Sequence, residues 1–196
     1  MTPEVRVDSP STLEQVRFMR TARRFIRLPS LLAFYRLLLA AGLGITGAQC
    51  QVQEEATVVY LVRHADKLDE SADAPLIAAG RERAEMLSEM LKDAGLTHIH
   101  TTDLQRTRDT AAPISERLGI QPRLYATNEL QGLADWLRAT PGRHLVSGHQ
   151  NSTTSLIRLL GGESTDIADP EYDRLYILTL DPDGTASTVL LRYGSP

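Results

Sequence analysis

Arg63 and His64 are the two neighbouring residues of this chain best suited to chemistry on a charged substrate. They follow directly on the apolar run 58–62, in the sequence VVYLVRHADK. A continuous apolar run is typical of a strand that is covered on both faces. Guanidinium groups pair with phosphate oxygens in bidentate fashion, and neutral imidazole is a competent nucleophile. The pair therefore indicates chemistry on phosphorus at the end of a buried strand.

Two more segments of the same kind follow later strand candidates. They are TTDLQRTRDTA at 101–111 and SGHQNS at 147–152. In open α/β sheets, ligands bind beyond the carboxyl ends of the strands, so we expect all three segments to lie at one edge. Together they supply arginines, histidines, hydroxyls and two helix N-termini. That set suits a tetrahedral dianion.

Arg106 is the cation of the second segment that we expect to face this edge. With Asp103 as the cap of a helix ending at Leu118, Arg106 falls at the third helical position. Arg108 lies about 200° further round the helix. We therefore interpret Arg108 as a solvated surface residue.

His64 and His149 are the two histidines of the predicted site. His64, attacking phosphorus, would form a phosphohistidine that water then hydrolyses, while the arginines neutralise the equatorial oxygens. This scheme requires no metal or other cofactor. His149 precedes a helix whose cap is expected at Asn151 or Ser152. Asn151 is a further candidate for phosphate binding.

Alternating segments along the chain predict an α/β fold. The strand candidates and helix candidates follow one another from residue 57 onward, and DPDG at 181–184 predicts a turn between the last two strands. The strands are 58–62, 99–102, 144–147, 175–180 and 188–193, and the helices are 80–94, 103–118, 133–138 and 152–160. We expect a three-layer sandwich in which helices flank a mostly parallel central sheet.

The three segments resemble the signatures of the histidine phosphatase superfamily, also called the phosphoglycerate-mutase-like family. LVRHADK resembles its L-V-R-H-[AG]-[DE] motif, TTDLQRTRDTA its [ST]-[DS]-x-x-R-[AT]-x-x-T-A segment, and LVSGHQ its V-x-[SG]-H segment. The similarity is greatest to small RHADK-type members with a short insert, some of them exported. The resemblance implies a phosphoglycerate-mutase-like fold with His64 as the phospho-accepting nucleophile. It also implies that Arg63, Arg106 and His149 complete the phosphate pocket.

The acid that protonates the leaving oxygen is less well marked. In many superfamily members it lies in a longer insertion, in an L-x-E context; the matching stretch here is the short LYATNELQG. Glu129 is the best candidate, although a plain carboxylate at a helix start is the interpretation we favour. Asp66 is an alternative, whose other roles would be to orient His64 or to pair with Lys67. Without a firm acid, we expect activity on good leaving groups or on acyl-phosphate and phosphoramidate substrates.

The other histidines have simpler interpretations. His98 and His100 form an H-x-H pair that could hold a metal, but no carboxylate cluster lies nearby in the sequence. They flank Ile99 at the start of a short strand, which favours a structural role. His144 begins another strand candidate and is also interpreted as structural.

The first fifty residues differ from the rest of the 196-residue chain. Arginines precede an uncharged run at 37–49, which is shorter than the roughly 20 residues of a membrane span. A secretory signal with a small-residue cleavage site at 46–48 is the interpretation we favour; translation from Met19 would give it a more ordinary length. The mature protein would then be periplasmic or secreted. The alternatives are an uncleaved membrane anchor and a cytosolic chain.

Two other patterns near this segment carry little weight. GLGITG at 42–47 matches the dinucleotide pattern G-x-G-x-x-G, but no helical apolar stripe follows it. Cys50 suggests a lipoprotein, but Gln49 stands where a small residue is expected. Because Cys50 is the single cysteine, no intrachain disulfide can form. We therefore predict a signal or anchor at 1–50, a linker at 51–56 and one domain at 57–196.

The sequence as a whole predicts a phosphoric monoester hydrolase. The formal net charge is −4 and no basic block is present, which excludes a nucleic-acid partner. The expected partner is a small phosphorylated substrate or a phosphoprotein, with membrane contact only through the N-terminal segment. One alternative is a phosphoglycerate-mutase-type phosphotransferase, which needs a closed pocket. Another is a phosphate-binding module without catalysis.

Overall fold

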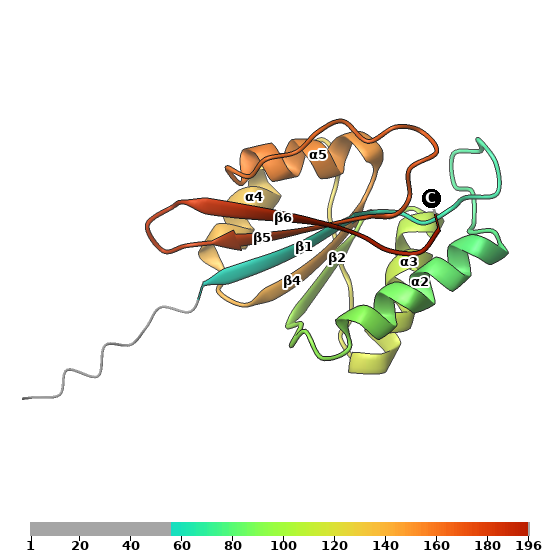
Figure 1. Cartoon of the computed structure of the whole chain (residues 1–196), viewed down its shortest axis with the longest axis horizontal. Coiled ribbons are helices and arrows are strands. Elements are labelled where there is room, and N and C mark those ends of the chain that lie inside the picture. The colour runs from blue at the N-terminus through green and yellow to red at the C-terminus, as the bar shows by residue number, and fades with distance from the viewer. Residues whose placement is uncertain (1–55, 196) are drawn as a thin grey trace, which may run out of the picture. The chain divides into compact units, whose positions relative to one another are not determined.

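The computed structural model describes residues 56–195 (Figure 1). The predicted signal or anchor at 1–50, its cleavage site, Met19, Cys50, the GLGITG pattern and the linker up to residue 55 lie outside the described residues. Within residues 56–195, no helix is long and apolar enough to cross a membrane.

Six strands form one mixed sheet in the order β3-β2-β4-β1-β5-β6. Their bounds are β1 Thr57–Arg63, β2 His98–Thr101, β3 Arg123–Leu124, β4 Arg143–Gly148, β5 Arg174–Leu180 and β6 Ala186–Arg192. β1 to β4 run parallel, and β5 and β6 are antiparallel to their neighbours. The predicted α/β class with a mostly parallel central sheet is confirmed. The two-residue strand β3 was not predicted, because two exposed residues leave no periodic signal.

Four helices cover the two faces of this sheet. They are α2 Ala78–Leu91, α3 Gln105–Leu118, α4 Leu130–Ala139 and α5 Gln150–Leu159, and Figure 1 shows α4 and α5 on one face and α2 and α3 on the other. Alternate residues of β1 enter opposite cores: Val59 and Leu61 pack with α4 and α5, and Tyr60 and Val62 pack with α2 and α3. This burial on both faces explains the continuous apolar run.

The predicted start of α3 is wrong. Asp103 does not cap α3; the helix begins at Gln105, and the Gln105 N–H donates to the carboxylate of Asp73 at 2.5 Å. Asp103 instead pairs with Arg108, whose side chain lies on the surface as predicted. Arg106 is therefore the second helical residue rather than the third. A cap from a distant loop replaces the local one, which sequence spacing alone does not reveal.

The start of α2 is packed against the end of β1. The Ile77 N–H donates to the carbonyl oxygen of Asp66 at 3.0 Å. A Cβ at Gly80 would lie 2.3 Å from that same oxygen. Glycine at position 80 therefore allows the helix to approach the turn that follows His64.

Candidate active site

His64 lies directly beyond β1, with 3% of its surface exposed. Its N–H donates to the carbonyl oxygen of Gly148 at 2.8 Å, which ties it to the end of β4. Its Nδ1 lies 2.8 Å from the carbonyl oxygen of Ala65. Because a carbonyl only accepts, Nδ1 carries the proton and Nε2 keeps its lone pair. Burial lowers the pKa of His64 to about 3, so the imidazole is neutral at neutral pH.

Arg63 is held by the segment that precedes β5. Its Nη1 donates to the carbonyl oxygens of Ala168, Asp169 and Glu171, and its Nη2 pairs with the Asp169 carboxylate at 3.1 Å. The guanidinium also lies over the ring of Tyr172, 4.2 Å from its centroid. The Nε of Arg63 is buried and has no partner among the described residues. One N–H of a fixed cation is therefore free for a ligand.

Arg106 has the same division between fixed and free N–H groups. Its Nη1 donates to the carbonyl oxygen of Ala72 in the loop between β1 and α2, at 2.8 Å. Its Nε is buried and without a partner among the residues described. The start of α3 and this loop therefore fix the second cation.

His149 is the residue that precedes α5. The predicted cap at Asn151 or Ser152 is wrong, because the helix already begins at Gln150. The His149 N–H donates to Ser152 Oγ at 2.9 Å, and its Nε2 lies 3.2 Å from Thr102 Oγ1. The rings of His149 and His64 are 5.5 Å apart, edge to face. Burial, with smaller contributions from the cations of Arg106 and Arg63, lowers the pKa of His149 to about 4.

Two buried threonines, which sequence reasoning did not single out, fix the backbone around His64. The Ala65 N–H donates to Thr110 Oγ1 at 2.9 Å, and the same hydroxyl donates to the carbonyl oxygen of Arg106 at 2.7 Å. Thr153 Oγ1 donates to the carbonyl oxygen of Val62 at 3.3 Å. Thr110 belongs to the second motif segment and could have been found there. Tyr172 and Asp169 had no sequence signal, because their contact with Arg63 is long-range.

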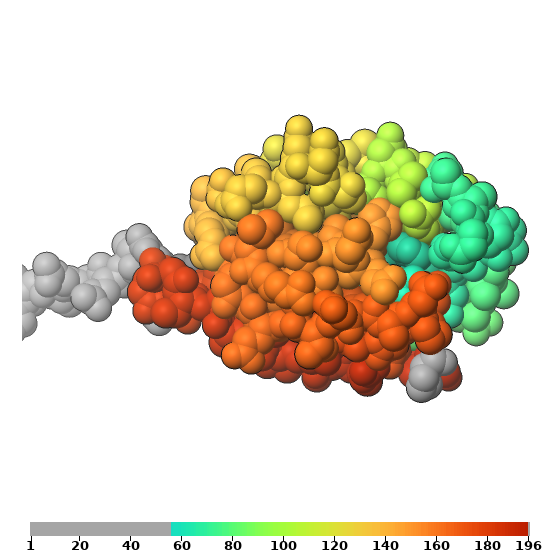
Figure 2. Space-filling view, turned by 90° about the horizontal axis from the view of Figure 1, so that it is seen from above, coloured from blue at the N-terminus to red at the C-terminus, as the bar shows by residue number. Residues whose placement is uncertain are grey.

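A cleft of about 680 Å³ opens beside Arg106 and His149. Glu129 and Asn151 also line it, with Asp103, Tyr125 and other residues of the 124–129 segment. Glu129 stands at the start of α4, so both of its predicted roles remain open. Figure 2 shows the segments that surround the site, from three distant parts of the chain, meeting at the right-hand end of the molecule.

The carboxylate of Asp66 does not pair with Lys67, which was one of its predicted roles. Its carboxylate accepts from Arg83 Nε at 2.8 Å, and Lys67 pairs with Glu70 instead. Arg83 is buried and also donates to the carbonyl oxygens of Tyr193 and Ser195. Asp66 therefore joins the turn after His64 to the C-terminal residues.

His98, His100 and His144 lie together on the face of the sheet covered by α4. The rings of His98 and His144 are stacked at 4.7 Å, and Trp136 packs edge to face against all three. Within residues 56–195, no three His, Cys, Asp or Glu side chains are arranged to hold a metal ion.

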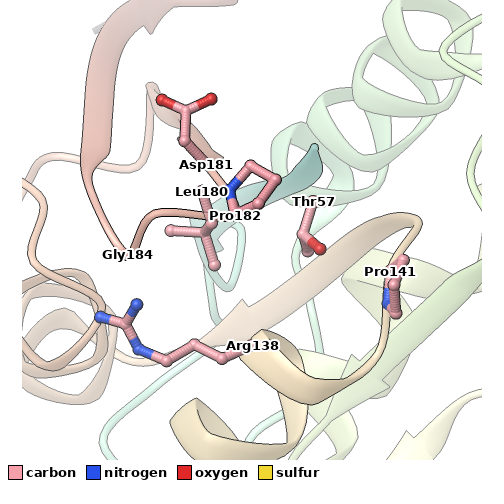
Figure 3. A pocket seen from close by; sticks show the side chains of 7 residues that line it. All are labelled: Thr57, Arg138, Pro141, Leu180, Asp181, Pro182 and Gly184. Atoms are coloured by element: carbon pink, nitrogen blue, oxygen red, sulfur yellow. The ribbon is translucent and has the colours of Figure 1, made fainter. Parts of the chain in front are cut away.

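A separate hollow of about 390 Å³ lies at the opposite end of β1 (Figure 3). Thr57, Arg138 and Asp181 are among its lining residues. Thr57 begins β1, whereas His64 follows its last residue, so the length of β1 separates this hollow from His64. It offers no histidine or other strong nucleophile.

The side chains around His64 are arranged for an anion. Two fixed guanidinium groups each keep a buried, unpaired Nε–H, and the two histidines beside them are held neutral. Buried donors without partners are rare and require an acceptor. A tetrahedral oxyanion supplies several acceptors at once.

Comparison with known proteins agrees with this arrangement. Residues 59–131 match the sequence profile of the histidine phosphatase superfamily (branch 1). Over this range the chain is similar to the histidine phosphatase superfamily. The matched range contains the first two motif segments, with His64 and Arg106.

Curated relatives of this chain include proteins described as probable phosphoglycerate mutase GpmB. The protein from Yersinia enterocolitica is 35% identical over 36% of this chain and 38% of its own length. The protein from Salmonella paratyphi A is 32% identical over 54% of this chain and 55% of its own length. The chain thus spans about a third to a half of the length of the curated relatives it matches.

Several solved structures share the fold of this chain. The protein histidine phosphatase SixA, complexed with tungstate, has a TM-score of 0.59 at 16% identity and covers 69% of this chain and 96% of its own. The mycobacterial glucosyl-3-phosphoglycerate phosphatase has a TM-score of 0.56 at 14% identity, covering 72% and 100%. Phosphoglycerate mutase from Bacillus anthracis has a TM-score of 0.54 at 17% identity, covering 73% and 95%.

Proposed function

We propose that this chain hydrolyses phosphate monoesters or related phosphoryl groups through a phosphohistidine on His64. The observation that carries the proposal is the pair of buried, unpartnered Nε–H groups of Arg63 and Arg106 beside a neutral imidazole. A bound phosphate would satisfy both donors. It would also bring phosphorus within reach of the free lone pair on His64 Nε2.

The reaction has two displacement steps. In the first, His64 Nε2 attacks phosphorus, the P–N bond forms, and the P–O bond to the leaving group breaks. In the second, a water oxygen attacks phosphorus, the P–N bond breaks, and the proton of that water passes to phosphate or solvent. The Nδ1–H bond to the carbonyl of Ala65 keeps the ring oriented in both steps.

The cations act on the phosphoryl oxygens in each transition state. Charge on these oxygens is spread when the transferring group is planar, and fixed donors stabilise it without reorganisation. Arg63 and Arg106 are fixed by backbone carbonyls, so they are already positioned for this role. Glu129, in the adjacent cleft, is our candidate for protonating the leaving oxygen.

A phosphoglycerate-mutase-type transfer is the second candidate, because curated relatives carry that description. A mutase must return the phosphoryl group to an organic acceptor before water reaches it. The cleft beside Arg106 is wide and opens to solvent along the exposed residues 126–129. Hydrolysis is therefore the reaction that we favour.

Phosphate release by the purified chain tests the proposal. We expect turnover of a panel of phosphate esters in excess EDTA, its loss in His64→Ala, and its retention in His98→Asn, a histidine variant outside the cleft. Quenched reactions should contain protein-bound phosphate that is stable in alkali and labile in acid. Interconversion of phosphoglycerates without phosphate release would favour the mutase, and phosphate binding without turnover would favour a binding module.

A further inference from the structure

A second, smaller hollow adjoins the cleft and is not explained by phosphate chemistry. We call it the side cavity: it has a volume of about 150 Å³, lies beneath α4, and is lined by His100, Arg123, Tyr125, Glu129, Leu133 and Trp136, among others. It shares residues 124–126 and Glu129 with the cleft. The side cavity is therefore next to the space where a substrate would lie.

A chain of hydrogen bonds determines which ring nitrogen of His100, in the wall of the side cavity, carries the proton. His144 Nε2 lies 2.9 Å from the carbonyl oxygen of Thr140, so that nitrogen carries the proton. His144 Nδ1 is then an acceptor, and His100 Nε2 faces it at 3.5 Å as the donor. This leaves the lone pair of His100 on Nδ1.

His100 Nδ1 is buried and has no partner within residues 56–195. His100 itself has no exposed surface. A buried acceptor without a donor is unfavourable. Burial lowers the pKa of His100 to about 3, so protonation does not remove the lone pair at neutral pH. No donor among residues 56–195 therefore reaches this atom.

The other walls of the side cavity combine aromatic and apolar groups with the charged side chains of Arg123 and Glu129. The indole of Trp136 meets the ring of His100 edge to face at 5.0 Å, and the guanidinium of Arg123 lies 4.7 Å from the indole centroid. Leu133 is buried in the core below. A cavity of about 150 Å³ has the volume to hold a benzene ring.

We propose that the side cavity binds a small aromatic ring that carries a hydroxyl or N–H donor. The ring packs on Trp136 and Leu133, and the donor bonds to His100 Nδ1. Because the side cavity shares lining residues with the cleft, we take the ring as the part of the substrate distal to phosphate. That last step rests on the proposed function; binding of the ring does not.

Trp136 provides a direct readout, because it is the single tryptophan of the chain. The full chain is titrated with phenol, and with toluene as a ring of similar size without a donor, while tryptophan fluorescence is excited selectively. We expect a saturable change with phenol and an affinity for toluene lower by about 10-fold, from the lost hydrogen bond. Equal affinities, or a change that does not saturate, would overturn the proposal.

Gly132 offers a matched pair of variants. It lies at the mouth of the side cavity, one helical turn before Trp136, and a Cβ there would have no atom within 4 Å. Gly132→Leu should place a side chain in the mouth and weaken phenol binding by at least about 10-fold, whereas Gly132→Ala should bind as the parent does. Unchanged binding in Gly132→Leu would contradict the assigned site.

Hydrolysis of two esters separates this proposal from the proposed function. Hydroxyphenethyl phosphate should exceed phenethyl phosphate in kcat/KM in the parent and in Gly132→Ala, and this preference should disappear in Gly132→Leu. Phenol binding without hydrolysis of either ester would support the side cavity and contradict the hydrolase. Equal hydrolysis of both esters without phenol binding would support the hydrolase and overturn the side cavity.

Discussion

Asp66→Ala removes the carboxylate that Arg83 Nε contacts at 2.8 Å. Arg83 is 8% exposed, and its other N–H groups still reach the carbonyls of Tyr193 and Ser195. Breaking a buried ion pair from one side costs about 3–5 kcal/mol. Since two carbonyl partners remain and Asp66 is partly exposed, we expect a loss of about 2–3 kcal/mol in the free energy of unfolding.

Thermal unfolding followed by circular dichroism measures this loss. For a domain of about 140 residues, about 2–3 kcal/mol corresponds to a fall in Tm of about 7–10 °C. The matched control is Asp166→Ala, which removes the partner of Arg158 in an exposed pair. A surface pair contributes at most about 1 kcal/mol, so the control should lose less than about 3 °C.

Enzyme kinetics distinguish a structural role of Asp66 from a role as the general acid. Well below its Tm, Asp66→Ala should keep kcat/KM within about threefold of the parent, because Asp66 is held by Arg83. Asp66→Asn keeps an acceptor for Arg83 and should be milder in stability. A loss of about 100-fold in kcat/KM for Asp66→Asn at unchanged Tm would refute the reasoning and make Asp66 the general acid.

Three further predictions concern the leaving group, the packing of α2 and pH. Glu129→Gln should lower kcat/KM by about 100-fold for alkyl phosphates but less than about threefold for activated aryl phosphates, and an equal effect on both would exclude it as the acid. Gly80→Ala should lose about 1–3 kcal/mol in urea unfolding, because its Cβ would meet the Asp66 carbonyl oxygen at 2.3 Å; a gain, as helix propensity alone predicts, would contradict this contact. Four histidines with lowered pKa values stay neutral in the folded chain but bind protons near pH 6.5 when the chain is unfolded. The stability that they contribute is therefore present above about pH 6.5. It falls by up to about 1.4 kcal/mol per group and pH unit as the pH drops toward their folded pKa values. Urea midpoints at about pH 7.5 and about pH 5.5 test this, and an unchanged midpoint would contradict it; the groups are His64, His100, His144 and His149, with folded pKa values of about 3 to 4.

The strands and the three motif segments could be predicted from the sequence because their signals are local. The run 58–62 is apolar throughout because β1 is covered on both faces, and that pattern is visible in one sequence. The rule that ligands bind at carboxyl strand ends then brings the segments of Arg63, Arg106 and His149 together. In the structure, Arg106 and His149 line one cleft, and the ring of His149 lies against that of His64.

The contacts that complete the site could not be predicted, because each joins residues far apart in the chain. Asp73 replaces the local cap of α3, and Arg83 rather than Lys67 takes the carboxylate of Asp66. The segment 168–172 holds Arg63 although more than a hundred residues separate them. Periodicity and propensity describe neighbours in sequence, so they do not specify such partners.

The strand order has a consequence for how the molecule folds. β1 is the first described strand to leave the ribosome, yet its neighbours in the sheet are β4 and β5, which are made much later. The apolar residues of β1 therefore stay unpaired while the intervening helices form. This raises the contact order of the fold and slows folding. A nascent chain that ends before Arg174 already contains His64, Arg106 and His149, but one edge of β1 is still open. Among the described residues, His64 is made early and is enclosed among the last.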